Sequence, residues 1–319
     1  MAFAAGMAQQ QDHPSLPIID FSAFLDGSGK QAVANAMLSS LQSIGFVYLT
    51  NHGLSDNDVQ NIFNWTCDDP PFTGYSPPGL EKISQVVEGD LEKGKDVKES
   101  FESGREEDEL MPNIWLPDGV LPGFKEACLD FFWICFQLEK TILKALAIVF
   151  NLPEDYFLSF HTKPDNQLRL LHYPSVPLHA LETHQISRIN GHTDFGSLTI
   201  LFQDDVGGLE VEDPHSPGRF VSVQPAPPVP GSIVVNAGDF LMRWSNDTIR
   251  STAHRVRSPP GLVSVDGLVP ERYSIPYFCC ADFSTIVDAI PGSWSVEKPK
   301  KYPPISAAEY VLERLAANY

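Results

Sequence analysis

The feature that most constrains the fold is a change of pattern at Leu168, where short apolar runs separated by turns replace long helical periodicity. Runs of this length, bounded by Gly, Pro, Asn or Asp, are typical of β-strands. Several short strands with such regular punctuation predict a barrel or a sandwich. We expect strands near residues 168–173, 197–202, 208–212, 220–223, 232–236, 252–257 and 272–278.

The chain before this point is mainly helical by the same kind of reasoning. Apolar residues recur at three- and four-residue steps from Gly123 to Phe150, and Pro153 ends that pattern. Ser55 is a candidate N-cap for an earlier helix, with Asp58 three residues on. We expect helices at 31–43, 55–65, 123–150 and 306–315, short strands at 16–21 and 45–49, and an exposed or mobile charge-rich stretch at 87–110.

Composition limits the classes of partner. The chain has 319 residues, a hydrophobic fraction of 43% and a formal net charge of −19. This acidic balance argues against nucleic acid and against an anionic membrane surface, because both attract basic patches. The five cysteines form no zinc-type pair and fit reduced thiols. We expect no signal peptide and no membrane span, and therefore a cytoplasmic location.

Three residues in the β-like part have metal-ligand chemistry. His192 and Asp194 form an HxD pair, and residues two apart on a strand share a face. His254 follows in a later strand-like run. Two imidazoles and one carboxylate on one side of an ion leave its other positions open, which suits iron(II) and dioxygen. His172 also lies on an expected strand, and we place it in the core or behind the metal.

A carboxylate clamp accompanies this set. Arg272 and Ser274 lie two apart on an alternating run, so a guanidinium and a hydroxyl can face one carboxylate together. A small oxo-acid co-substrate beside a metal needs such a clamp. The ordinary alternative is that Arg272 forms a simple salt bridge and that the histidines are satisfied core or surface residues.

At these residues the chain resembles the isopenicillin N synthase-like branch of the iron(II)/2-oxoglutarate-dependent oxygenases. The matching motifs include GHTDFGSLTI at 191–200 and RYSIPYF at 272–278. Further ordered matches lie at 16–21, 45–53, 207–211, 235–239 and 244–256, so the resemblance runs from Leu16 to the C-terminus.

The resemblance implies a mainly β fold with flanking helices, built on a double-stranded β-helix or jelly roll. We expect a disordered tail at 1–15, an N-terminal oxygenase region at 16–120, and a helix plus the jelly-roll catalytic core at 121–319, integrated in one domain.

The resemblance also implies roles for the candidate site residues. His192, Asp194 and His254 would bind iron(II). The distal carboxylate of 2-oxoglutarate would be bound by Arg272 and Ser274, with Tyr173 as a third donor. The implied reaction uses O2 to hydroxylate or otherwise oxidise a C–H bond of a small organic substrate, and it forms succinate and CO2.

Within the family, the sequence is similar to fungal-type members such as thymine 7-hydroxylase, notably in DNQLRLLHYP at 165–174. The matching substrate positions are Asn166, Arg169 and Phe278, and Phe195 stands where the nucleobase enzyme has Tyr. Because Phe195 lacks that phenol, thymine is not established as the substrate. A planar heterocycle or a natural-product intermediate of secondary metabolism fits this partly aromatic pocket.

Two rival functions follow from the same residues. One is an oxidase that does not use 2-oxoglutarate, in which the Arg272–Ser274 pair serves a carboxylate of the substrate itself. The other is a non-catalytic binding protein that kept the fold. This second rival rests on residues 66–73, because the family normally carries a longer segment there, near the substrate entrance.

Overall fold

The computed structural model describes residues 16–67, 75–78, 95–223, 231–259, 261–262, 264 and 266–318. The expected tail at 1–15 and most of the short segment at 66–73 lie outside the described residues. Among the described helices, none combines the length and the apolar character that crossing a membrane requires.

Two sheets form the centre of the molecule. The larger has eight strands in the order β1 (Ile18–Asp20), β2 (Phe46–Thr50), β13 (Ile233–Ala237), β10 (Leu198–Gln203), β16 (Arg272–Cys279), β6 (Gln167–Tyr173), β5 (Glu99–Ser103) and β3 (Tyr75–Ser76). The smaller has four, β12 (Phe220–Ser222), β11 (Leu209–Glu212), β14 (His254–Val256) and β9 (Ile189–His192). Strand pairs complete the β structure: β15 (Leu268–Val269) with β7 (Val176–Pro177), β17 (Ile286–Val287) with β18 (Ile305–Ser306), and β4 (Lys95–Asp96) with β8 (Ile186–Ser187).

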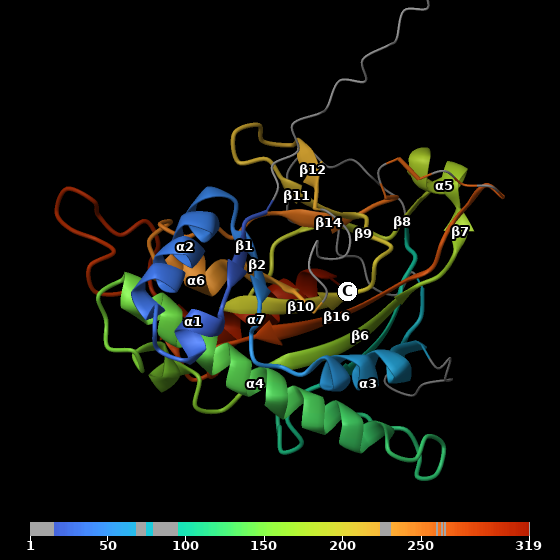
Figure 1. Ribbon diagram of the computed structural model, residues 1–319, viewed down its shortest axis with the longest axis horizontal. Coiled ribbons are helices and arrows are strands. Elements are labelled where there is room, and N and C mark those ends of the chain that lie inside the picture. Colours follow the sequence, from blue (N-terminus) through green and yellow to red (C-terminus); the bar gives the residue numbers. More distant parts are fainter. Residues whose placement is uncertain are drawn as a thin grey trace, which may run out of the picture.

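Helices flank this β structure: α1 (Ser22–Leu25), α2 (Lys30–Ser43), α3 (Asp56–Cys67), α4 (Phe124–Val149), α5 (Leu178–Glu182), α6 (Asp239–Trp244), α7 (Ala307–Asn318) and a 3-10 turn, η1 (Phe157–Phe160). Figure 1 shows α4 on one side of the large sheet and the four-stranded sheet on the other. The expected cap of α3 is present, because the Ser55 hydroxyl accepts a hydrogen bond from the Asp58 backbone N–H at 3.1 Å. The expected mainly β fold with flanking helices is confirmed.

Alternation along the central strands gives the large sheet two different faces. On β6, Leu170 joins the core against α4, whereas Leu171 and Tyr173 join the apolar cluster between the sheets. On β16, Ile275 and Tyr277 pack toward α4. Successive side chains of a strand point to opposite faces, so the intervening residues of β16 face the space between the sheets.

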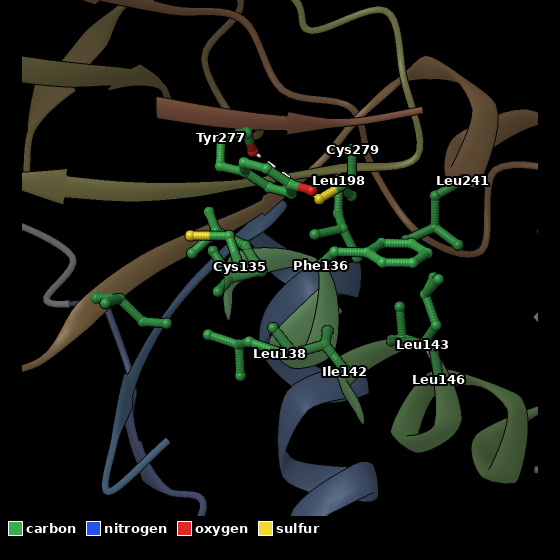
Figure 2. Packing of buried hydrophobic residues seen from close by; sticks show 14 of the residues in the cluster. Cys135, Phe136, Leu138, Ile142, Leu143, Leu146, Leu198, Leu241, Tyr277 and Cys279 are labelled. Carbon is green, nitrogen blue, oxygen red and sulfur yellow. Dashed lines mark hydrogen bonds between the residues drawn. The ribbon is translucent and has the colours of Figure 1, made fainter. Parts of the chain in front are cut away.

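Helix α4 carries the largest apolar face that covers the sheet. Figure 2 shows Cys135 and Ile142 of α4 in one cluster with Tyr277 and Cys279 of β16. These four side chains are fully buried. The three- and four-residue spacing of the apolar positions places them on one stripe of the helix, which is why this segment is helical and buried.

Several short elements were not expected, and β5 and α6 are two of them. Residues 99–103 belong to the stretch expected to be exposed or mobile, yet they form β5, and Phe101 is 2% exposed. The pairing with β6 supplies the partner that the charge-rich sequence did not indicate. Helix α6 begins directly after β13 and was not expected, because six residues carry too little periodicity to identify.

The packing of α4 gives a stability prediction. Ile142→Ala removes a fully buried side chain and should lower the free energy of unfolding by about 2–5 kcal/mol. Gln137→Ala, on the exposed face of the same helix, should change it by less than about 0.5 kcal/mol. Urea denaturation measures both, and equal losses would contradict the assigned orientation of α4.

Candidate functional site

A cavity lies between the two sheets and collects every candidate site residue. Strands β6, β10, β13 and β16 line one wall, β9, β11 and β14 line the other, and Val311 and Leu315 of α7 contribute a side. Much of the lining is aliphatic: Leu171, Ile189, Leu201, Leu209 and Val256. This largely apolar lining lowers the local polarity, which strengthens the electrostatic contacts of a bound molecule.

The HxD pair and the distant histidine meet in this cavity. His192 is the last residue of β9 and lies opposite His254, the first residue of β14. One ligand atom from each of His192, Asp194 and His254 lies within 4.8 Å of the others. The expectation that His192 and Asp194 share a strand face was wrong, because β9 ends at His192 and Asp194 lies in the loop beyond.

Both imidazoles are oriented for coordination. The Nδ1 of His192 is 2.9 Å from the Asn190 carbonyl oxygen, and the Nδ1 of His254 is 3.1 Å from the Thr252 carbonyl oxygen. A carbonyl only accepts, so each Nδ1 carries the proton and each Nε2 presents a lone pair. The two Nε2 atoms lie 3.8 and 3.7 Å from Asp194 Oδ1, which leaves space for one ion between them.

The carboxylate of Asp194 is held by its other oxygen. Oδ2 accepts hydrogen bonds from Thr199 Oγ1 at 2.6 Å and from Asn236 Nδ2 at 2.7 Å, so Oδ1 stays directed at the imidazoles. Burial alone would raise the pKa of Asp194, but His254, His192 and these hydrogen bonds lower it below its ordinary value. Burial and the neighbouring His254 lower the pKa of His192 to about 4. At neutral pH the site therefore offers a neutral His192 imidazole and an ionised Asp194 carboxylate.

The loop that carries Asp194 is fixed by backbone contacts to α6. The Asp239 N–H donates to the Asp194 carbonyl at 2.8 Å, and the Phe240 N–H donates to the Gly196 carbonyl at 3.0 Å. A Cβ at Gly196 would collide with the Cys279 carbonyl oxygen. Glycine at this position lets the loop lie directly against β16, which brings the HxD pair and the clamp strand together.

The expected carboxylate clamp lies on the cavity faces of β16 and β6. Arg272 Nη1 is 3.1 Å from Ser274 Oγ, and Arg272 lies opposite Tyr173 in the β6–β16 register. The Arg272 Cζ is 5.0 Å from the centroid of the Tyr173 ring. All three side chains are buried, and burial raises the pKa of the Tyr173 phenol, which stays a hydrogen-bond donor.

Two further side chains contact the clamp residues and were not identified from sequence. Gln203 Oε1 accepts a hydrogen bond from Arg272 Nη2 at 3.0 Å, and Arg188 lies close to the Tyr173 ring. Gln203 lies opposite Ser274 across the β10–β16 pair. These contacts join segments that are distant in sequence, so they become visible only when the pairing of the strands is known. Asn236 was likewise missed as a partner of Asp194, although its segment was recognised.

The four expected substrate residues line the same cavity: Asn166, Arg169, Phe195 and Phe278. The Arg169 Cζ is 5.5 Å from the Phe278 ring centroid, and its Nη2 is 2.6 Å from Glu102 Oε1. The guanidinium therefore presents a neutralised charge beside an aromatic face. Phe195 lies under Arg314 of α7, whose Cζ is 5.0 Å from the ring centroid.

The side chain of Asn166 is largely occupied within the protein. Its Nδ2 donates to Glu139 Oε2 at 2.5 Å and to Tyr277 Oη at 2.9 Å, and its Oδ1 accepts from the Cys280 N–H at 2.7 Å. Burial raises the pKa of Glu139 to about 8. Because both amide hydrogens are used, the predicted substrate contact is confined to the second lone pair of Oδ1.

His172 differs from its expected place in the core or behind the metal. It stacks on Tyr273 with ring centroids 4.7 Å apart, and its ring nitrogens lie 3.5 Å from Glu99 and 3.2 Å from Glu271. Its side chain is 22% exposed. The alternation of β6 places His172 on the face opposite Tyr173, so it does not reach the cavity.

The residues present fit a divalent metal and an oxo-dicarboxylic acid. The Nε2 atoms of His192 and His254 and the Oδ1 atom of Asp194 form a compact, borderline-to-hard donor set. Arg272 Nε is buried without a hydrogen-bond partner among the described residues. An unpartnered buried guanidinium nitrogen is costly, and an anion in the cavity removes that cost.

Comparison with known proteins places this geometry in context. Residues 164–281 match the sequence profile of the 2OG-Fe(II) oxygenase superfamily, and residues 16–68 match the profile described as the N-terminal region of non-haem dioxygenase in morphine synthesis. The chain is 38% identical to proline hydroxylase buaE of Petromyces alliaceus, covering 94% of this chain and 98% of that protein.

Two further relatives cover nearly the whole chain. The 2-oxoglutarate-dependent dioxygenase frbA of a Dothideomycetidae species is 35% identical, covering 96% of this chain and 97% of that protein. The crystal structure of full-length Neurospora crassa thymine 7-hydroxylase, with α-ketoglutarate and thymine, aligns with a TM-score of 0.84 at 38% identity. That alignment covers 97% of this chain and 99% of the other.

The support of Asp194 gives a prediction on metal affinity. Asn236→Ala removes one of the two donors to Oδ2 and should weaken Mn(II) binding by about 10- to 100-fold. Asn64→Ala, on the exposed surface of α3, should leave the affinity unchanged. Titration calorimetry measures both, and wild-type affinity in Asn236→Ala would argue against the assigned orientation of Asp194.

Acid sensitivity provides a second prediction. His161 is buried beneath the HxD loop, with Nε2 2.8 Å from Ser197 Oγ, and burial lowers its pKa to about 4. The unfolded chain binds a proton near pH 6.5, so this group lowers the free energy of unfolding as the pH falls from 6.5 to 4. The slope is about 1.4 kcal/mol per pH unit.

The control is a variant without the ionisable ring. His161→Gln of the metal-free protein should show a shallower loss of stability over the same pH range in urea denaturation. An unchanged pH dependence would show that His161 does not carry this share of the acid sensitivity.

Proposed function

The chain belongs to the 2OG-Fe(II) oxygenase superfamily, and we propose that it oxidises a C–H bond of a small nitrogen heterocycle, free or within a natural-product intermediate of secondary metabolism. It is a non-haem dioxygenase that uses iron(II), 2-oxoglutarate and O2 and forms succinate and CO2. One observation carries the assignment: two imidazole nitrogens and one carboxylate oxygen converge in the same cavity as Arg272, whose buried Nε has no hydrogen-bond partner among the described residues.

In this proposal His192, Asp194 and His254 hold the iron. When bound, iron(II) supplies the oxidation chemistry with O2 and 2-oxoglutarate. The protein contributes the rest. The carbonyls of Asn190 and Thr252 keep both imidazoles in the tautomer that coordinates metal, and the hydrogen bonds to Asp194 Oδ2 fix the third ligand.

Arg272, Ser274 and Tyr173 bind the distal carboxylate of 2-oxoglutarate. The guanidinium and the two hydroxyl-bearing side chains face one point of the cavity, and charge-assisted hydrogen bonds of this kind are the strongest that a carboxylate forms. Gln203 orients the guanidinium through Nη2. The aliphatic walls exclude water, so the co-substrate is oriented before it reacts.

The substrate would lie between Phe278, Phe195 and Arg169. Arg169 is paired with Glu102, so this wall offers an aromatic face and polar edges with little net charge. A neutral or zwitterionic ring suits these edges better than a polyanion does. A proline hydroxylase and a thymine-bound structure are among the relatives, and proline and thymine are both small nitrogen heterocycles.

The test is succinate formation from 2-oxoglutarate in the presence of candidate heterocycles, with proline, proline-containing peptides and pyrimidines included. Asp194→Ala should reduce turnover to background because the carboxylate ligand is lost. Leu312→Ala, at an exposed position of α7, should leave it unchanged. Turnover of Asp194→Ala at the wild-type rate would refute the assignment of the metal site.

Oxygen uptake separates the rival readings. Uptake that depends on 2-oxoglutarate is the expected result. Equal uptake without it would favour an oxidase in which Arg272 and Ser274 hold the substrate, and absence of iron(II) binding would favour a non-catalytic protein.

A further inference from the structure

A second buried guanidinium lies beside the clamp. Arg188 lies between β8 and β9 and is 0% exposed. Its Nη2 donates to the Pro270 carbonyl oxygen, while Nε and Nη1 have no hydrogen-bond partner among the described residues. A fully buried arginine with two unpartnered nitrogens is unusual, because burying such groups costs several kcal/mol unless charge or hydrogen bonds compensate.

Arg188 and Arg272 contact the same tyrosine. The Arg188 Cζ is 5.9 Å from the centroid of the Tyr173 ring, and the Arg272 Cζ is 5.0 Å from it. Cations over an aromatic face are attracted to it, so two guanidiniums fix the plane of this ring. The direction of the Tyr173 hydroxyl therefore depends on both arginines.

Neither Arg188 nor Arg272 forms a salt bridge within the described part of the chain. Asp204 acts electrostatically on both arginines, but its carboxylate also accepts hydrogen bonds from the backbone N–H groups of Tyr273 and Val206. Burial and Arg272 lower the pKa of Arg188 to about 10, which still leaves it cationic at neutral pH. Two buried positive charges thus lie beside Tyr173, and only that of Arg272 lines the cavity.

We propose that Arg188 is a positioning residue of the 2-oxoglutarate site: it holds Tyr173 against the distal carboxylate and supplies the second positive charge that selects a dicarboxylic co-substrate. The proposal rests on the proposed function of the site. Arg188 does not line the cavity, so it acts through Tyr173 and through its field rather than by direct contact. Its effect should appear only with a co-substrate that carries the distal carboxylate.

The matched ligand for this test is 2-oxopentanoate, which has the chain length of 2-oxoglutarate and lacks the distal carboxylate. Binding of each acid to the iron(II)-loaded protein is measured anaerobically by titration calorimetry, so the readout is independent of turnover. Arg188→Met should raise the Kd of 2-oxoglutarate by about tenfold to thirtyfold, as expected for a charge lost at this range. It should leave the Kd of 2-oxopentanoate within about twofold.

Arg188→Lys keeps the charge and loses the planar group that stacks on Tyr173, so its shift should be intermediate and again limited to 2-oxoglutarate. Arg188→Lys serves as the test variant if Arg188→Met does not fold. Arg243→Met is the control, because Arg243 also stacks on a tyrosine, donates to a carbonyl and has an unpartnered Nε, but lies on α6 outside the cavity.

Equal shifts for both acids, or an unchanged Kd for 2-oxoglutarate in a folded Arg188 variant, would overturn the proposal. These outcomes leave the proposed function intact. Failure of the wild-type protein to bind 2-oxoglutarate would instead refute the proposed function, and the inference with it.

Discussion

The structure of the site depends on one buried carboxylate, Asp194, and on how its loop is held. The Asp239 N–H fixes its backbone, and Thr199 and Asn236 fix Oδ2, so only Oδ1 is free to meet the two imidazoles. Each of these partners comes from a different element: α6, β10 and β13. The large sheet and helix α6 must therefore be folded before the three ligand atoms are brought together. The metal site thus depends on the complete fold.

Strand β16 contributes side chains both to the hydrophobic core and to the cavity. One face packs Ile275 and Tyr277 against α4, and the other carries Arg272, Ser274 and Phe278 into the cavity. Successive side chains of β16 alternate between its two faces, so burying one group of residues against α4 directs the other group toward the ligand. A shift of one residue in the register would exchange the faces, so the apolar contact with α4 also sets the position of the carboxylate clamp.

The local sequence pattern was enough to predict part of the fold and part of the candidate site. The pattern of short apolar runs predicted most strands of the two main sheets but few of the short strand pairs. The HxD pair with His254 and the Arg272–Ser274 spacing pointed to side chains that the structure brings into one cavity. The expectation that Asp194 lies on the same strand as His192 was wrong because β9 ends at His192. The roles of Arg188 and Gln203, and the occupied amide of Asn166, depend on contacts between segments far apart in sequence. Spacing carries no such information, and β5 was missed because burial there comes from β6.

The most direct test is a crystal structure of the protein with iron(II) and 2-oxoglutarate, prepared without oxygen. The account predicts one metal ion bound by the Nε2 atoms of His192 and His254 and by Asp194 Oδ1, with the distal carboxylate of 2-oxoglutarate on Arg272 and Ser274. A metal ion bound by other side chains, or a 2-oxoglutarate carboxylate remote from Arg272, would contradict it.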